Sequence, residues 1–410
     1  MKILHTADWH LNDRLGRIDR TGDLRTAVER VAAACESERV DVLIVAGDLF
    51  SEQARPEALR ETIRHWQEVF AGFLSGGGTI LTCTGNHDSE TFCQTLRSAM
   101  ELAAPAVEGT GQTVPPGRLY LAADPTLLRL ASPRGFDVQF LLMPYPTATH
   151  YLKGNEAGYT GTDDKMKLLN AAFEREIERL RSHEYFRPGL PNVLIAHANV
   201  FGAVVGESLF RMNLADDVVV NCDRFAERFD YVALGHIHKE QSLGHRHIRY
   251  SGSIEAMDLG ERNDRKSLTL LEIDRSGLVA DPVLLPLPST PIYELTIRDP
   301  DADLPRLKAE YEGAEADLVN LHVNYTAGLH RLEDVLRELS AIFPRWYARD
   351  WQESTRAGLT LVPGEAADAR GFAETVKDYL TQELQNHSDE ERTALVSLAE
   401  ELMAELDAGT

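Results

Sequence analysis

Apolar residues recur over the first 150 residues in short runs, separated by longer stretches with helical periodicity. Residues 42–46 and 79–83 predict buried strands, and residues 55–73 between them predict a helix. Residues 120–121 and 138–143 continue the strand pattern. This alternation of strands and helices is typical of an α/β layered domain.

The pattern continues as far as residue 281 and then changes. Residues 164–182 predict an amphipathic helix. Further strands are predicted at residues 193–196, 231–234, 248–250 and 267–273. Four prolines between residues 282 and 291 predict a domain boundary, which makes residues 1–281 the first domain.

Beyond this boundary the chain predicts two smaller parts. Residues 291–357 show the order β-α-β-α-β, which is typical of a small α+β cap domain. Its elements are expected at residues 292–297, 304–311, 318–325, 331–343 and 345–351. After Pro363 and Gly364, residues 365–410 predict two amphipathic helices that either pack on the cap or bind a partner.

Composition narrows the class of protein. The 410 residues are 43% hydrophobic and 26% charged, and no apolar run is long enough to cross a bilayer. We expect no signal peptide, and four cysteines without CxxC spacing indicate reduced thiols in a cytoplasmic protein. The net charge of −23 argues against unaided, non-specific binding of nucleic acid. It does not exclude a nuclease, because bound cations or a basic partner can reverse the local charge.

Residues 3–6 also predict a strand, and on an extended segment after it Asp8 and His10 would point the same way. Side chains able to bind metals follow this strand and four of the others, and each group alone is a weak indication of a metal site. Asp-x-His triplets are common on surfaces, an Asp after Gly often forms a turn, and a lone His is more often structural than a ligand. Five strand ends in one chain that all carry such groups are improbable by chance. The residues are Asp8 and His10; Asp48; Asn86, His87 and Asp88; His197; and His236 and His238. The other histidines, including His245 and His247, are interpreted as surface or structural residues.

This order of motifs resembles the calcineurin-like metallophosphoesterases, and within them the SbcD branch of bacterial nuclease subunits. The markers of that branch cover residues 1 to about 275. They are the segments DWHL at 8–11, AGDLF at 46–50, LGHIHK at 234–239, YSGSIE at 250–255 and DLGE at 258–261.

The resemblance implies a four-layer α/β/β/α sandwich and a two-metal phosphodiesterase. One cation would be held by Asp8, His10, Asp48 and His238, and the second by Asp48, Asn86, His197 and His236, so that Asp48 bridges them. The mixed nitrogen and oxygen ligands suit Mn²⁺ better than Mg²⁺. His87 is expected to protonate the leaving oxygen, with Asp88 orienting its ring.

The same resemblance implies DNA as substrate and an SbcC-type ATPase as partner, with this chain forming a homodimer within a heterotetramer. Residues 365–410 would then dock on the coiled coil of the ATPase. Ser51 departs from the archaeal relatives, which carry a histidine there that helps to handle DNA. Two alternatives stay open: a phosphodiesterase or phosphatase for small substrates, and a scaffold with a vestigial site.

Overall fold

The computed structural model describes residues 1–103, 113–152, 158–205, 218–221 and 226–354, together with Leu395 and Leu398. Residues Met1–Tyr325 and Arg331–Gln352 form one compact unit and are described together. Apart from Leu395 and Leu398, the predicted helices within residues 365–410 lie outside the described residues, and so does Cys222. No helix among the described residues is both long and apolar enough to span a bilayer.

Two sheets form the larger part of this unit. The first has the order β17-β16-β1-β4-β5-β7, with β18 paired to β16, and the second has the order β14-β15-β13-β10-β9-β8-β6. The strands of the first sheet are β1 (Lys2–Thr6), β4 (Val42–Val45), β5 (Thr79–Cys83), β7 (Leu119–Ala122), β16 (Ser267–Asp274), β17 (Gly277–Leu278) and β18 (Val283–Pro286). Those of the second are β6 (Thr113–Val114), β8 (Thr126–Ala131), β9 (Asp137–Met143), β10 (Asn192–His197), β13 (Tyr231–Gly235), β14 (Gln241–Leu243) and β15 (His245–Tyr250).

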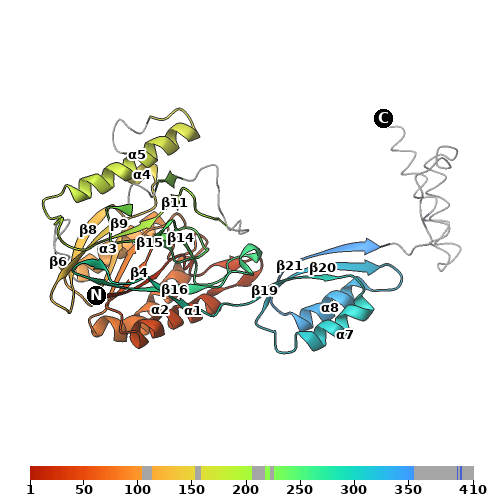
Figure 1. Ribbon diagram of the computed structural model, residues 1–410. Coiled ribbons are helices and arrows are strands. Elements are labelled where there is room, and N and C mark those ends of the chain that lie inside the picture. The colour runs from red at the N-terminus through yellow and green to blue at the C-terminus, as the bar shows by residue number, and fades with distance from the viewer. Residues whose placement is uncertain are drawn as a thin grey trace. The chain divides into compact units, whose positions relative to one another are not determined.

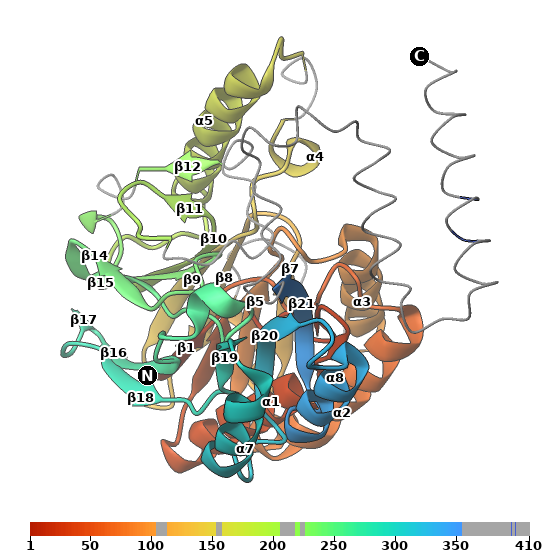
Figure 2. The same cartoon turned by 90° about the vertical axis from the view of Figure 1, so that its right-hand side faces the viewer.

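Helices cover the outer side of each sheet, and Figures 1 and 2 show the helix layers on opposite sides of the sheets. The helices α1 (Thr21–Ser37), α2 (Pro56–Ser75) and α3 (Glu90–Ala103) accompany the first sheet. The helices α4 (Ala148–Tyr151) and α5 (Thr162–Arg181) cover the second. A third apolar cluster joins Ile3 and Ile44 of the first sheet to Phe140 and Ile195 of the second. The mixed α/β class is confirmed, and the three clusters place the core on both sides of each sheet.

The proline-rich stretch differs from the prediction. Its first part, Val283–Pro286, is strand β18, which pairs antiparallel with β16 and extends the first sheet. Pro286 lies at the end of this edge strand, where a missing N–H costs no ladder hydrogen bond. The first sheet therefore continues past residue 281.

The cap elements form a three-stranded sheet in the order β19-β20-β21, with two helices packed on one face (Figure 1). The strands are β19 (Ile292–Ile297), β20 (Leu318–Thr326) and β21 (Trp346–Ser354), and the helices are α7 (Pro300–Glu310) and α8 (Leu332–Ile342). Helix α7 begins at Pro300, earlier than the predicted residue 304. The Asp299 carboxylate accepts a hydrogen bond from the N–H of Asp301 and caps the helix, and Pro305 lies inside it.

A short hairpin just after the first motif contacts the cap. It consists of β2 (Arg14–Leu15) and β3 (Ile18–Asp19). The Arg17 guanidinium lies 3.9 Å from the centroid of the Trp346 ring, and its Nε donates to the Trp346 carbonyl at 3.0 Å. The cap is thereby attached to the segment that immediately follows His10. The small strands β11 (Asn199–Val200) and β12 (Val219–Val220) and the 3-10 helix η2 (Leu259–Glu261) complete the described elements.

Candidate metal centre

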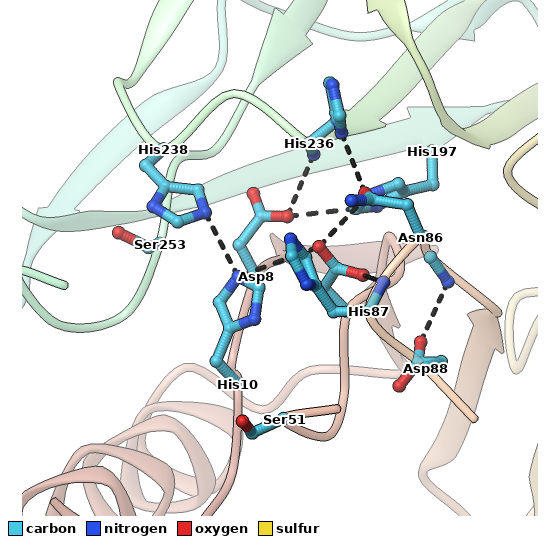
Figure 3. Close-up of polar contacts among 12 residues, drawn as sticks. Asp8, His10, Ser51, Asn86, His87, Asp88, His197, His236, His238 and Ser253 are labelled. Carbon is cyan, nitrogen blue, oxygen red and sulfur yellow. Dashed lines mark hydrogen bonds and ion pairs between the residues drawn. The ribbon is translucent and has the colours of Figure 1, made fainter. Parts of the chain in front are cut away.

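The predicted ligands meet where parallel strands of both sheets end. In the first sheet, Thr6 pairs with Val45 and Val45 with Thr82, so β1, β4 and β5 end at the same level. In the second, His197 pairs with Gly235, so β10 and β13 also end together. Figure 3 shows Asp8, His10, Asn86, His197, His236 and His238 around one space. Ligands of open α/β sheets collect at this edge because parallel strands deliver their loops to it.

The first motif reaches the site by a different backbone path from the predicted one. Strand β1 ends at Thr6, and Asp8 and His10 have left-handed φ values of 53° and 42°, so strand alternation does not place them. Backbone hydrogen bonds instead join this segment to the loop after β4: Asp8 N to Gly47 O at 3.1 Å, and His10 N to Asp48 O at 3.0 Å. Trp9 is buried between Asp8 and His10 and packs edge-on against Trp66, 5.5 Å between centroids.

Strained backbone recurs at two more of the predicted ligands. Asp48 has φ 52° and His236 has φ 103°, which L-residues rarely adopt. Each such residue costs about 1–3 kcal/mol and persists where the surrounding structure holds it. Four of the seven predicted ligands thus lie in an unfavourable conformation, as is common at functional sites.

Glycines beside the ligands permit the close approach of the loops. A Cβ on Gly85 would lie 2.0 Å from Asp48 Oδ1, and one on Gly47 would lie 2.2 Å from His197 Nδ1. The glycines before Asp48 and Asn86 are therefore required by space and not only by turn geometry.

One group of ligand atoms lies around His10. Its Nε2 is 3.1 Å from His238 Nε2 and 3.6 Å from Asp48 Oδ2. Asp8, His10 and His238 each offer a ligand atom, all within 4.8 Å of one another. The two imidazole nitrogens face each other across the distance that separates two ligands of one cation.

A second group lies around His197. Its Nε2 is 3.3 Å from Asp48 Oδ2 and 3.0 Å from Asn86 Oδ1, while His236 Nδ1 is 2.9 Å from the same Asn86 oxygen. Asp48 Oδ2 therefore lies between the two groups, as a bridging ligand would. Asp8, Asp48 and His197 also form a set within 4.8 Å, so Asp8 borders both groups.

Both carboxylates are buried, which makes their charge costly. Burial raises the pKa of Asp8 above its usual range, and the neighbouring Asp48 raises it further. Burial also acts to raise the pKa of Asp48. The His197 and His10 imidazoles outweigh this effect and hold the pKa of Asp48 well below its usual range. Burial lowers the pKa of His197, yet Asp48 and Asp8 raise it to about 9.

This environment fits divalent cations. Asp8 and Asp48 are 0% and 1% exposed, and within the described residues only histidines lie within ion-pair distance of them. Asp8 Oδ2 is buried and has no hydrogen-bond partner among the described residues. Two buried carboxylates without Lys or Arg need positive charge from another source, and metal ions supply it.

His87 lies beside the ligands, while the carboxylates around it differ from the expectation. The His87 ring packs edge-on against the His10 ring, with 5.1 Å between centroids. The backbone N–H of His87 donates to Asp48 Oδ1 at 2.9 Å. The Asp88 carboxylate accepts hydrogen bonds from the N–H groups of Phe50 and Gly85, at 2.9 and 2.8 Å, so it holds the loop. The carboxylate opposite His87 Nδ1 is that of Glu52, at 3.6 Å.

Ser51 does not face the ligands (Figure 3). It is buried, and its hydroxyl donates to Asp13 Oδ1 at 2.7 Å. The position therefore ties the loop after β4 to the segment after His10.

A buried polar group behind His238 escaped sequence reasoning. Glu261 Oε1 lies 2.7 Å from His238 Nδ1, and Glu261 Oε2 accepts from Lys266 Nζ at 2.5 Å and from Ser253 Oγ at 3.1 Å. Burial raises the pKa of Glu261, but Lys266 and His238 lower it more, and the net pKa is below the usual range. The segments 250–255 and 258–261 contain two of these residues, but nothing in their spacing indicates that they contact His238.

The remaining described histidines do not join the cluster. His245 is exposed on the β14–β15 hairpin, and His65 faces Glu29 at 3.0 Å. His322 lies between Glu294 and Asp350 on the cap sheet.

Comparisons with known proteins agree with this geometry. The model of the family "Calcineurin-like phosphoesterase" matches residues 1–240. Similar curated proteins include the SbcD subunit of the SbcCD nuclease from Staphylococcus epidermidis, 26% identical over 73% of this chain and 73% of its own length. The protein of the same name from Rhodobacter capsulatus is 29% identical over 70% of this chain and 69% of its own length. The protein of the same name from Staphylococcus saprophyticus is 23% identical over 85% of this chain and 84% of its own length. With more than half of its length matched by the family model, and with the family's ligand types gathered at the strand ends of both sheets, the chain belongs to the calcineurin-like phosphoesterases.

Proposed function

We propose that this chain is the nuclease subunit of an SbcCD-like complex and hydrolyses DNA phosphodiesters with the help of bound divalent cations. The observation that carries the proposal is the cluster of two buried carboxylates and four imidazoles, with no Lys or Arg paired to the carboxylates among the described residues. The relatives named as nuclease subunits match most of the chain, and they support DNA as the substrate whose phosphodiester bonds are cleaved.

Seven residues would hold the cations, in two sets that share Asp48. Asp8, His10 and His238 lie on one side, and Asn86, His197 and His236 on the other. When bound, the cations lower the pKa of water at the site and offset the charge that develops on the phosphate. The protein's own contribution is to fix these donors before substrate arrives, through the strained backbone and the backbone hydrogen bonds between loops.

His87 is the residue we assign to proton transfer. It is anchored by its backbone N–H on Asp48 and packs against His10, so its ring lies at the border of the ligand cluster. There it can donate a proton to the departing O3′. Asp88 supports it indirectly by holding Phe50 and Gly85, and Glu52 faces its Nδ1.

Manganese is the cation we expect. Four imidazoles, two carboxylates and one amide oxygen mix nitrogen with oxygen donors, whereas Mg²⁺ prefers oxygen ligands and retains water. Iron or zinc would also suit this donor set.

DNA contact requires a positive surface that this chain, with its net charge of −23, supplies poorly by itself. We therefore propose that an SbcC-type ATPase supplies the rest of the positive surface that contacts DNA. Two copies of this chain would form a cytoplasmic heterotetramer with the ATPase. Docking through residues 365–410 remains a sequence-based part of this proposal.

Hydrolysis assays with Mn²⁺ test the proposal. Purified chain, alone and with its ATPase, would be given labelled linear duplex, a DNA hairpin and a small chromogenic phosphodiester. We expect cleavage of the DNA substrates and its loss in His87→Ala. Cleavage of the small ester alone would favour a small-molecule phosphodiesterase, and inertness on every substrate would favour a scaffold. The matched control is His245→Ala, which removes an exposed histidine and should change nothing.

A further inference from the structure

His238 differs from His197 in the group that contacts its Nδ1 atom. Its Nδ1 is 2.7 Å from the Glu261 carboxylate, whereas His197 Nδ1 is 2.8 Å from the carbonyl oxygen of Ala46. A carboxylate behind a ligating imidazole fixes its tautomer and makes it a stronger donor than a carbonyl does. The two sides of the centre are therefore chemically unequal.

Glu261 is held in place from several directions. Its second oxygen accepts hydrogen bonds from Lys266 Nζ at 2.5 Å, Ser253 Oγ at 3.1 Å and Met257 N at 3.2 Å. Glu261 and Lys266 are 1% and 4% exposed. A buried ion pair of this kind is rigid, because moving either partner would leave the other charge unpaired.

The same loop also holds the backbone of His238. Lys266 Nζ and Ser253 N donate to the His238 carbonyl oxygen, at 3.2 and 3.1 Å. A Cβ on Gly252 would lie 2.6 Å from that oxygen, so glycine is required for the loop to pass this close. Ring and backbone of His238 are thus positioned by one buried cluster, which we define as Ser253, Glu261 and Lys266.

The tautomer follows from this contact. The Glu261 carboxylate only accepts hydrogen bonds, so the Nδ1 atom of His238 carries the proton. The lone pair of Nε2 then points to the side where His10 Nε2 lies 3.1 Å away. That is the orientation a cation ligand needs.

We propose that Glu261 is a positioning residue for His238, with Lys266 and Ser253 holding it, and that it makes the cation position at Asp8, His10 and His238 the tighter of the two. The inference rests on the proposed function for the presence of two cations, and it adds an order of filling and the residues that set it.

Titration of metal-free protein with Mn²⁺ tests this proposal, by calorimetry and by electron paramagnetic resonance, which separates a single bound ion from a coupled pair. We expect two steps in the wild type. Glu261→Gln keeps an acceptor for Nδ1 but loses the charge, and should weaken the tighter step about 10- to 100-fold while leaving the weaker step unchanged. Glu261→Ala removes the acceptor as well and should weaken the same step further.

Glu240→Gln is the matched control, because Glu240 lies close to His238 in sequence but its carboxylate pairs with Arg249. If Glu261→Gln does not fold, Ser253→Ala removes one donor to Glu261 and should weaken the same step by a smaller factor. Unchanged affinities in a folded Glu261 variant, or an equal loss at both steps, would overturn the inference. A wild type that binds two cations in this order but cleaves no DNA would refute the proposed function alone.

Discussion

The two sheets contribute different chemistry to the metal centre. The first supplies both carboxylates, the Asn86 amide and the His10 imidazole, while the second supplies only imidazoles, those of His197, His236 and His238. Loops of the first sheet are joined to each other by backbone hydrogen bonds, such as Asp8 N to Gly47 O. The second sheet meets them by close packing, since a Cβ on Gly235 would lie 1.9 Å from Ala46 O. The first sheet thus carries the negative charge, and the contact between the sheets creates the site.

Asp48→Asn gives the sharpest test of the charge on the first sheet. The substitution preserves the shape but removes the charge of the carboxylate that lies between both ligand groups. We expect DNA cleavage to fall by at least on the order of 10⁴-fold, equivalent to about 5 kcal/mol, and Mn²⁺ binding to weaken. Rates and equilibrium dialysis measure the two effects. Cations retained at wild-type affinity would show that this charge does not hold them.

His87→Ala separates proton transfer from metal binding on the same sheet. Cleavage should fall by about 10²–10⁴-fold, the usual contribution of a general acid, while Mn²⁺ stoichiometry stays unchanged. Elemental analysis of the purified variant checks the second part. Loss of metal in this variant would place His87 among the ligands instead.

Gly85→Ala tests the space between the loops of the first sheet. The new Cβ would lie 2.0 Å from Asp48 Oδ1 and 2.5 Å from Asp48 N, so backbone must move. We expect a loss of about 1–3 kcal/mol in the free energy of unfolding, together with weaker Mn²⁺ binding. Urea unfolding measures the stability. Gly189→Ala is the control, because nothing lies within 4 Å of a Cβ there, and an equal loss in both variants would refute the steric argument.

His5→Gln tests the contact between the sheets. His5 is fully buried, its Nδ1 3.0 Å from the Tyr231 hydroxyl and its Nε2 3.2 Å from the Leu234 carbonyl. Burial lowers the pKa of His5 to about 3. The unfolded chain, with a pKa near 6.5, then binds more protons, so stability is present above about pH 6.5 and is lost as the pH falls toward 3.

The measurement is the free energy of unfolding of metal-free protein at pH 5 and at pH 7. Wild type should lose up to about 1.4 kcal/mol per pH unit from this residue, and His5→Gln should remove that part of the slope. The exposed His245→Gln provides the comparison. An unchanged slope in His5→Gln would mean that His5 does not stay neutral between the sheets.

Periodicity predicted most elements that carry the site. Strands β4, β5, β10 and β13 lie within one residue of their predicted ranges, because buried strands are continuous apolar runs bounded by glycine or polar residues. The pattern does not single out α1, α3 or β8. Strand β18 lies where prolines predict a boundary, because pairing with β16 overrides the local signal.

The types of ligand residue could also be predicted from the sequence, since these residues follow strand ends at short sequence distances. The backbone conformation of Asp8 and His10 could not be predicted, because their left-handed φ values are held by long-range hydrogen bonds from their own N–H groups to the Gly47 and Asp48 carbonyls. Asp88 was expected to orient His87 and holds Phe50 and Gly85 instead. No local pattern distinguishes these partners.

The sequence by itself determined which residues could bind cations and that they follow strands, since both are local properties of the chain. Tertiary structure alone decided that Asp8 meets His236, 228 residues away, and that Glu261 lies behind His238. These contacts depend on the packing of two sheets around one core, and such packing is set by many residues together and not by a motif.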